Sequence, residues 1–339
     1  MKKKKILHVL PSNSFSGAEN VVCTIIKNAT EYDMYYCCPR GEIEEILKEK
    51  GIKYIPIDKL TPKNIKKVCK SEKIDILHAH DLKASFCCAL SGFKGKIISQ
   101  LHTNWDFNSS WNIYTITYYI LMKKFYKIIV VSKEIVETSI FSKKYPHKFN
   151  VITNVVDKDE VIKKSKQFKT DKYDIIYVGR ISKVKQPHII IEITKQLKKN
   201  FPNIRTCIIG CGELEDECKS LIEKYDLKKN IDMLGFKKNP FPYINNSKVA
   251  LLPSKHEGLP MSVIECMILD VPVINSGVDG LSTLFKNNKE FICNNIEDYC
   301  ATILKILNGD TSYEKKCKNI IKDAINMKDY IAKISDVYK

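Results

Sequence analysis

Residues 175–199 read IIYVGRISKVKQPHIIIEITKQLKK, and this stretch decides the fold class. It opens with a short apolar run, Ile175–Val178, typical of a parallel strand that is covered on both faces. A polar loop follows, and Pro187 then begins a helical pattern with an apolar residue at every fourth position from Ile189 to Leu197. A strand, a loop and a helix in this order predict one unit of a doubly wound α/β sheet.

The same alternation of apolar runs and helical patterns extends along the chain in both directions. In the second half the further predicted strands are Thr206–Ile209, Ile231–Leu234, Val249–Leu252 and Val271–Ile274. In the first half they are Ile6–Leu10, Met34–Cys37, Tyr54–Ile57, Ile74–His78, Ile97–Leu101 and Ile128–Val131. A last apolar stripe at helical spacing over Lys328–Lys339 predicts a terminal helix.

The length of the chain favours two domains. It has 339 residues, of which 44% are hydrophobic, and a single core stops growing near about 250–300 residues. Residues 157–172, DKDEVIKKSKQFKTDK, are charged and poor in large apolar side chains, so we interpret them as a linker. The prediction is a Rossmann-like domain over 1–156, a linker over 157–172, a second Rossmann-like domain over 173–325 and a terminal helix over 326–339.

The chain is strongly basic. Lysine and arginine number 56 and aspartate and glutamate 39, which gives a net charge of +17. This surplus suits an anionic partner such as a phosphate, a nucleic acid or an acidic membrane. The lysines are spread along the whole chain, however, so an ordinary solvated surface explains the charge equally well. Since no nucleic-acid motif is present, no nucleic-acid partner is expected.

Cysteine usage and hydropathy predict a cytoplasmic protein. The 13 cysteines form no CxxC pair and show no zinc-finger spacing, which is typical of reduced, buried thiols. The apolar run after the N-terminal lysines is too short for a signal peptide. Lysines also interrupt the longest apolar stretch, Ile113–Val131, so no membrane-spanning helix is expected.

Two interpretations of that stretch stay open. Lys123 and Lys124 lie near Trp111, Tyr118 and Tyr119, and this basic and aromatic composition suits peripheral contact with the inner face of an anionic plasma membrane. Alternatively, the stretch is a buried helix with a solvent-exposed basic edge, which is the preferred interpretation.

The segment KHEGLPMSVIE, residues 255–265, carries the strongest chemical signal. It follows a predicted strand and places Glu257 and Glu265 eight residues apart, the second just inside a predicted helix. A nucleotide-sugar site needs a carboxylate for sugar hydroxyls, another for ribose, and backbone donors with a helix N-terminus for phosphate. Ser262 and Glu265 also fit a capping box, in which the glutamate only returns to the backbone of the serine.

Arg180 and Lys185 form a second signal in the loop after Ile175–Val178. Both cations can converge on a diphosphate, where they would offset the charge that builds up on a departing nucleotide. The alternative is two solvated loop cations in a lysine-rich chain.

The ordered set of these segments resembles glycosyltransferase family 4, the retaining enzymes with the GT-B fold. The resemblance spans essentially the whole chain. The matching segments are SGAE at 16–19, VGR at 178–180 with Lys185, IGCGEL at 209–214, LGF at 234–236, and the two glutamates Glu257 and Glu265.

The resemblance implies two Rossmann-like domains that face a central cleft, with the C-terminal helix returning to the N-terminal, acceptor-binding domain. It implies transfer of a hexose or N-acetylhexosamine from a nucleotide-diphosphate sugar, UDP-sugar by preference. The acceptor would be a glycan or a lipid-linked molecule in surface polysaccharide biosynthesis. No metal or other cofactor is expected, because arginine and lysine neutralise the diphosphate.

Residue roles follow from the same resemblance. Arg180 and Lys185 would hold the donor diphosphate, Glu257 would contact the transferred sugar, and His102 would face donor and acceptor. The other donor-binding residues would be Gly17, Gly235, Phe236, Gly258, Leu259, Met261, Ser262 and, for the ribose, Glu265.

His78 and His80 form a separate candidate for a metal site. Two histidines at this spacing on a strand point the same way, but no third ligand stands at a suggestive spacing, so a structural or cleft-lining role is preferred.

Two further enzymes share parts of this pattern. A nicotinamide-dependent oxidoreductase would need a G-x-G-x-x-G motif after the first strand, where this chain has PSNSFSGAE instead. A UDP-sugar epimerase on the same two-domain fold stays open as an alternative, and a non-catalytic polyanion-binding protein is a more distant one.

Overall fold

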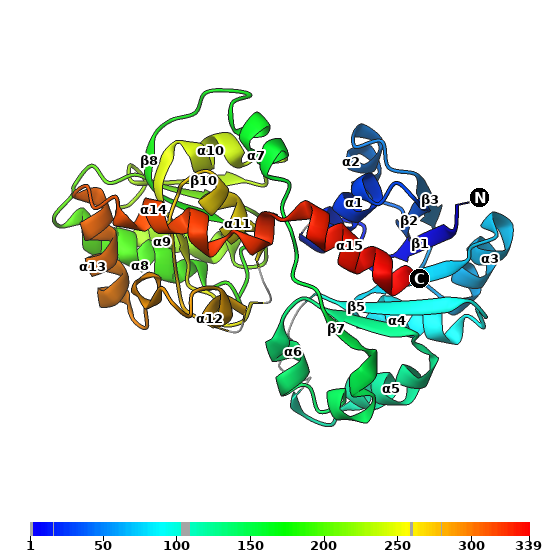
Figure 1. Ribbon diagram of the computed structural model, residues 1–339. Coiled ribbons are helices and arrows are strands. Elements are labelled where there is room, and N and C mark those ends of the chain that lie inside the picture. The colour runs from blue at the N-terminus through cyan, green and yellow to red at the C-terminus, as the bar shows by residue number, and fades with distance from the viewer. Residues whose placement is uncertain (1–2, 16, 103–108, 258–259, 279) are drawn as a thin grey trace. The chain divides into compact units, whose positions relative to one another are not determined.

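The computed structural model describes residues 3–15, 17–102, 109–257, 260–278 and 280–339. The chain divides into two compact units, Met1–Val155 with Asn326–Lys339, and Val156–Ile325. Within each unit a parallel sheet is covered by helices on both faces, as Figure 1 shows. The predicted α/β class with two doubly wound sheets is therefore confirmed.

Among the described residues the first unit has a seven-stranded sheet in the order β3-β2-β1-β4-β5-β6-β7. The strands are β1 Lys5–Val9, β2 Asp33–Pro39, β3 Tyr54–Ile57, β4 Ile76–His80, β5 Lys96–Leu101, β6 Lys127–Val130 and β7 Phe149–Val151. The helices are α1 Gly17–Asn28, α2 Ile43–Glu49, α3 Pro62–Glu72, α4 Asp81–Leu90, α5 Ile113–Leu121, α6 Lys133–Thr138 and α15 Met327–Tyr338. Short 3-10 turns are η2 Met122–Lys124, η3 Ser142–Lys144 and η4 Pro146–Lys148.

The two faces of this sheet differ in chemistry because side chains alternate along each strand. Leu7, Leu77 and Ala79 point into an apolar core that also includes residues of α3, α4 and α5. His8 and His78, each one position further, are cross-strand partners on the opposite face. There the C-terminal helix α15 covers the sheet, and its Tyr338 hydroxyl lies 2.8 Å from His78 Nδ1.

Helix α15 is held on the first unit by polar contacts as well as by apolar packing. Ser335 Oγ donates to Glu31 Oε1 at 2.5 Å, and the Tyr32 hydroxyl donates to the Ser335 carbonyl oxygen at 3.3 Å. Ile334 and Tyr338 are fully buried. The last helix of the chain is thus a structural part of the first unit, although the residues that precede it belong to the second.

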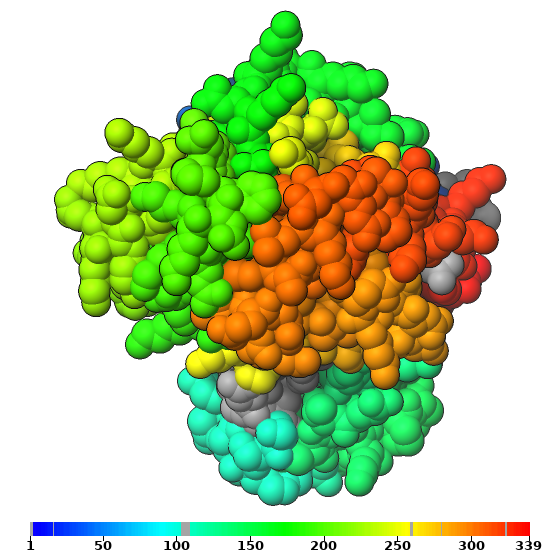
Figure 2. Space-filling model, turned by 90° about the vertical axis from the view of Figure 1, so that its left-hand side faces the viewer, coloured from blue at the N-terminus to red at the C-terminus, as the bar shows by residue number. Residues whose placement is uncertain are grey.

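The described residues of the second unit have a five-stranded sheet in the order β10-β9-β8-β11-β12. The strands are β8 Tyr173–Val178, β9 Thr206–Ile209, β10 Ile231–Gly235, β11 Ser247–Leu252 and β12 Val273–Asn275. The helices are α7 Lys158–Ser165, α8 Pro187–Lys198, α9 Glu215–Lys224, α10 Phe241–Asn245, α11 Met261–Ile268, α12 Gly280–Leu284, α13 Ile296–Leu307 and α14 Ser312–Ile320, with 3-10 turns η5 Lys289–Phe291 and η6 Asp323–Ile325. Helices α13 and α14, orange in Figure 2, form one outer face of this unit.

Residues 157–172 are not simply a linker. Asp157 caps helix α7 by accepting from the Glu160 backbone N–H at 3.0 Å. Acidic residues in the first turn and lysines in the last complement the helix dipole, so a composition that suggested a linker instead encodes a short helix. Val161 is 2% exposed and buries this helix against α10 and α11 of the second unit.

Two strand predictions were wrong in detail. Strand β4 runs from Ile76 to His80, two residues later than predicted. His80 is therefore part of the strand and directly precedes helix α4. Strand β7, Phe149–Val151, was missed because three residues are too few to show a period.

Among the described residues, no helix has both the length and the apolar composition that spanning a bilayer requires.

Candidate active site

An ion pair between Lys185 and Glu257 joins the loops that follow β8 and β11 in the second unit. Lys185 Nζ donates to Glu257 Oε1, and the two side chains are 23% and 5% exposed. Ser254 Oγ donates to the same carboxylate oxygen at 2.6 Å. A carboxylate this deeply buried is stable only with such partners, so its position is fixed before any ligand arrives.

The sheet order explains why these residues meet. Lys185 and Glu257 follow β8 and β11, which are adjacent although β9 and β10 separate them in sequence. The two loops are joined by a hydrogen bond from the Lys255 N–H to the Val184 carbonyl oxygen at 2.8 Å. The chain reverses its winding direction between these two strands, which is where open α/β sheets bind ligands.

Arg180 lies on the same loop as Lys185 with an exposed side chain. The loop is anchored by the Tyr177 hydroxyl, which donates to the Arg180 carbonyl oxygen at 2.7 Å. Burial raises the pKa of Tyr177 far above its usual value, the Glu257 charge raises it further, and the Arg180 charge opposes the shift. Tyr177 is thus within electrostatic range of both charged groups and stays a neutral hydrogen-bond donor.

Glycines let the loops after β8, β9 and β10 approach each other closely. Gly210 has φ of +143°, and a Cβ atom there would lie 1.8 Å from the Gly179 carbonyl oxygen. The Gly210 N–H donates to the Gly235 carbonyl oxygen at 3.0 Å. Phe236, predicted with Gly235 to lie by the base, is 54% exposed. The IGCGEL and LGF segments therefore lie side by side at the same sheet edge as Arg180.

Helix α11 carries Met261, Ser262 and Glu265, and it begins without a side-chain cap among the described residues. Its N-cap residue is Pro260, so Ser262 lies inside the first turn and the capping-box alternative is wrong. An uncapped helix start with no acidic residue in its first turn leaves backbone N–H groups for an anionic ligand.

The remaining predicted donor residues fall elsewhere. Gly258 and Leu259 lie outside the described residues. Met261 is 8% exposed, so its side chain packs inward, whereas Ser262 and Glu265 are half-buried. Gly17 and His102 belong to the first unit, where Gly17 is the first residue of α1 and His102 directly follows β5.

In the first unit His102 is the outer end of a chain of hydrogen-bonded imidazoles. His102 Nε2 lies 2.8 Å from His80 Nδ1, and His80 Nε2 lies 3.0 Å from His8 Nδ1. The His102 backbone N–H donates to Asp81 Oδ1 at 3.0 Å, which fixes the start of the chain. His8 and His80 are fully buried.

These histidines are neutral in the folded protein. Burial lowers the pKa of His8 to about 3. Burial also holds the pKa values of His78 and His80 well below the usual range, and the neighbouring rings lower them further. Burial lowers the pKa of His102 too, although Asp81 opposes that shift. A neutral imidazole at His102 can accept a proton or a hydrogen bond from a ligand.

The structure supplies the third ligand that the sequence did not show beside His78 and His80. Ring nitrogens of His8, His78 and His80 lie within 4.8 Å of one another, so the trio has the spacing to hold a metal ion. In this structure His8 Nδ1 and His80 Nε2 lie 3.0 Å apart as hydrogen-bond partners, and His78 Nδ1 is bonded to the Tyr338 hydroxyl at 2.8 Å. We therefore interpret the trio as part of a hydrogen-bonded network beneath His102.

Sequence reasoning overlooked His8, Ser254 and Tyr177. The signal for His8 was that it is the polar residue inside the apolar run Ile6–Leu10, whereas its pairing with His78 depends on strand order. The roles of Ser254 and Tyr177 depend on side-chain contacts between loops, which no local pattern indicates.

Comparison with known proteins gives matches over almost the whole chain. Residues 158–327 match the family described as glycosyl transferases group 1, and residues 15–160 match glycosyltransferase family 4. CapH of Staphylococcus aureus, a capsular polysaccharide biosynthesis glycosyltransferase, is 28% identical over 292 residues, covering 81% of this chain and 81% of that protein. The Escherichia coli UDP-Gal:alpha-D-GlcNAc-diphosphoundecaprenol alpha-1,3-galactosyltransferase is 26% identical over 298 residues, covering 80% and 77%.

A solved structure extends the comparison to the fold. Anabaena Alr3699/HepE in complex with UDP and glucose superposes with a TM-score of 0.85 over 99% of each chain, at 16% sequence identity. This similarity establishes the GT-B fold, with its two Rossmann-like domains.

Proposed function

The chain belongs to the group 1 glycosyltransferases of family 4, and from this premise we propose that it transfers a hexose or N-acetylhexosamine from a UDP-sugar with retention of configuration. The observation that carries the proposal is the Lys185–Glu257 pair, held at the switch point of the second sheet beside the uncapped start of α11.

In the proposed donor complex the charged residues bind different parts of the donor. Arg180 and Lys185 bind the diphosphate, whose charge grows as the bond to the sugar breaks. Lys185 has three N–H donors, so it can contact a phosphate oxygen while it keeps Glu257 in place. Glu257 accepts from sugar hydroxyls, Glu265 accepts from the ribose, and Gly235 and Phe236 lie by the base.

The proposed reaction needs no metal and no carboxylate that acts as a nucleophile. The acceptor hydroxyl oxygen bonds to the anomeric carbon as the bond from that carbon to the diphosphate oxygen breaks. The acceptor proton passes to the departing phosphate oxygen on the same face, which retains the configuration. Neutral His102 orients the acceptor hydroxyl or the sugar through Nδ1, because Nε2 is already bonded to His80.

We propose a glycan or lipid-linked acceptor in surface polysaccharide biosynthesis. The E. coli relative is named for a lipid-linked acceptor and the S. aureus relative for capsule biosynthesis. The proposed location is the cytoplasm, with peripheral contact to an anionic membrane where such an acceptor is embedded.

The test of the donor site compares two exposed cations on one loop. Arg180→Ala should lower kcat/KM by about 100- to 1,000-fold, because leaving-group charge loses a preorganised partner. Lys183→Ala is the matched control: its side chain is exposed, and its only described bond at this loop uses the backbone N–H, to Glu213 Oε1 at 3.2 Å. Both variants should unfold at the temperature of the parent protein.

The assay first screens UDP-, GDP- and ADP-sugars by thermal shift, then measures nucleotide release with polyprenyl-diphosphate sugars and short glycans as acceptors. NMR of the product gives the anomeric configuration. Equal turnover in Arg180→Ala and Lys183→Ala would refute the diphosphate site. A UDP-sugar isomerised without any acceptor would identify an epimerase instead.

A further inference from the structure

Exposed apolar side chains of the first unit concentrate on helix α5 and just before it. Ile113 is 71% exposed, Trp111 59% and Ile120 53%, and Tyr114 and Ile116 are exposed as well. Apolar surface left in water costs about 25 cal/mol per Å², so a contiguous patch of this kind marks an interaction site.

The helix has two distinct faces. Ile113, Ile116 and Ile120 recur at intervals of three and four residues, which places them on one stripe. The opposite face carries Tyr118 and Leu121, which are buried in the core of the unit. The helix is thus already docked by one face, and its solvent-facing stripe is not needed for folding.

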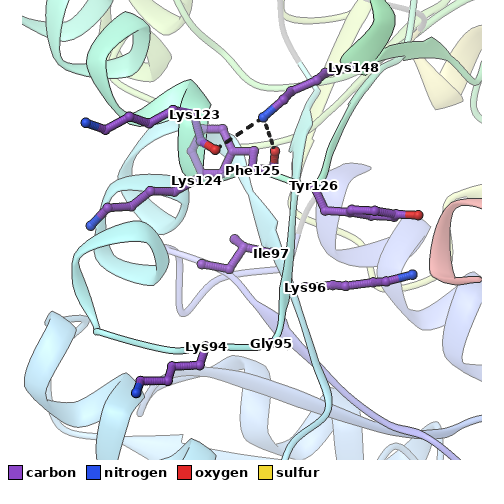
Figure 3. Close-up of a pocket in the computed structure, with 9 residues that line it drawn as sticks. All are labelled: Lys94, Gly95, Lys96, Ile97, Lys123, Lys124, Phe125, Tyr126 and Lys148. Atoms are coloured by element: carbon purple, nitrogen blue, oxygen red, sulfur yellow. Dashed lines mark hydrogen bonds between the residues drawn. The ribbon is translucent and has the colours of Figure 1, made fainter.

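A basic cavity of about 510 Å³ lies at the C-terminal end of this helix (Figure 3). It is lined by Lys94, Gly95, Lys96, Ile97, Lys123, Lys124, Phe125, Tyr126 and Lys148. In Figure 3 the ammonium groups of Lys94, Lys123 and Lys124 point to the same side, whereas Lys96 points the other way. We call these three residues the lysine cluster.

The lysine cluster is continuous with the apolar stripe. Lys123 and Lys124 follow Ile120 by three and four residues through the 3-10 turn η2, so they extend the same stripe. Lys124 Nζ donates to the Ala89 carbonyl oxygen at 2.9 Å, which brings exposed Leu90 beside the cluster. An apolar helix face therefore ends in a patch of positive charge.

No carboxylate neutralises this charge among the described residues, whose ion pairs do not include Lys94, Lys123 or Lys124. Lys148 adds to the repulsion while its Nζ donates to the Met122 carbonyl oxygen at 3.0 Å. Gathering several like charges is unfavourable, and an anionic partner removes that cost.

We propose that the α5 stripe and the lysine cluster together form a docking surface for an anionic phospholipid bilayer. The apolar stripe inserts among the upper acyl chains while the lysine cluster binds lipid phosphates. This combination of an apolar face and a basic edge is what holds a helix flat in the membrane interface. Helix α5 has nine residues, far fewer than a spanning helix needs.

The position of α5 connects this surface to the proposed chemistry. In a parallel sheet a crossover helix leads from the carboxyl end of one strand back to the start of the next. Helix α5 connects β5, after which His102 stands, to β6. This part of the inference rests on the proposed function: a membrane held against α5 would present a lipid-linked acceptor near the His102 edge of the first unit.

The test measures vesicle binding by the full chain. Sedimentation compares vesicles of phosphatidylcholine alone with vesicles that also contain phosphatidylglycerol, at low and high salt. Both tryptophans lie at positions 105 and 111, so their fluorescence should shift to the blue when the α5 surface meets lipid. We expect binding only to the anionic vesicles, and weaker binding as salt rises.

Two variants separate the charged and apolar parts. Lys94→Gln/Lys123→Gln/Lys124→Gln should weaken binding on the order of 100-fold, since each lysine at an anionic surface contributes roughly five-fold. Ile113→Ser/Ile116→Ser/Ile120→Ser should weaken it at least about ten-fold and abolish the blue shift. The matched charge control is Lys63→Gln/Lys66→Gln/Lys67→Gln, three exposed lysines on α3 of the same unit.

Each outcome decides the proposal. Equal binding to neutral vesicles, or equal loss in the α3 control, would overturn it. So would a dimer in light scattering that dissociates in the isoleucine variant, because a second copy would then cover the stripe. Protection of the lysine cluster by inorganic phosphate alone, without vesicle binding, would identify a soluble phosphate site instead. Arg180→Ala should bind vesicles normally, so a failed donor site and a failed docking surface are distinguishable.

Discussion

Acidification should unfold the first unit before the second, because the first unit buries neutral histidines. The unfolded chain protonates an imidazole below its usual pKa of 6.5, whereas burial keeps the pKa of His8 at about 3 in the folded state. The unfolded state therefore binds more protons, and the free energy of unfolding decreases as pH falls below about 6.5.

The size of this decrease follows from the pH range in which the unfolded chain is protonated while the folded rings stay neutral. Going from about pH 6.5 to about pH 5 costs about 1.4 kcal/mol per pH unit for each ring that stays neutral, or about 2 kcal/mol per ring. Burial also holds the pKa values of His78 and His80 well below the usual range, so both rings add to this loss in the same direction. Domain stabilities are about 5–15 kcal/mol, so the loss from His8 alone is a measurable fraction of the stability of the unit.

Urea unfolding followed by tryptophan fluorescence measures this loss of stability in the first unit. The only two tryptophans of the chain, Trp105 and Trp111, both belong to the first unit. His8→Asn keeps an amide near the position of Nδ1 but removes one titrating group. It should reduce the slope of unfolding free energy against pH below about 6.5 by about 1.4 kcal/mol per unit.

The control is His147→Asn, because His147 is an exposed histidine of the same unit and lacks the burial of His8. A parent protein whose stability is flat between about pH 7 and about pH 5 would refute the reasoning. So would a slope that His8→Asn and His147→Asn reduce equally, since burial would then not be the cause.

Three further outcomes are expected. Gly210→Ala should destabilise the second unit by more than about 3 kcal/mol in urea unfolding, because its Cβ would lie 1.8 Å from the Gly179 carbonyl oxygen. Gly309→Ala, which also has positive φ but no atom within 4 Å of the added Cβ, should cost only about 1 kcal/mol, and equal losses would contradict the steric argument. A thiol reagent on the native protein should modify Cys211 first, because Cys211 is the exposed cysteine among the described residues. Mass spectrometry of the labelled protein would show this order, and earlier labelling of a buried thiol would contradict it. Tyr338→Phe should cost about 1 kcal/mol of first-unit stability by removing the hydroxyl at the buried histidines, and an unchanged urea midpoint would show that this bond contributes nothing.

Local patterns were sufficient for the elements that have a clear period. The four-residue spacing after Pro187 predicted α8 to within one residue, and the run at Ile175–Val178 predicted β8 except for its first two residues. Patterns failed where a short segment depends on its surroundings. Residues 157–172 look like a linker by composition, and only the packing of α7 against α10 and α11 shows that Val161 is buried.

In the candidate site, too, local patterns predicted the residues but not their contacts. The sequence named Lys185 and Glu257 as separate loop residues, each with an ordinary alternative explanation. Strand order made them partners, because β8 and β11 are adjacent although 68 residues separate the end of one from the start of the other. The capping-box alternative for Ser262 was wrong because the N-cap of α11 is Pro260, two residues earlier, and such a difference decides which side chain can cap a helix.

The sequence by itself determined the family, the α/β class and the charged residues available for chemistry, because these depend on local composition and on ordered motifs. The tertiary structure alone decided which of those residues touch: the Lys185–Glu257 pair, the imidazole chain from His102 to His8, and the exposed stripe on α5. The physical reason is that contacts between distant segments depend on strand order and on which helix face is buried. Both are set by the packing of the whole unit rather than by any single stretch of chain.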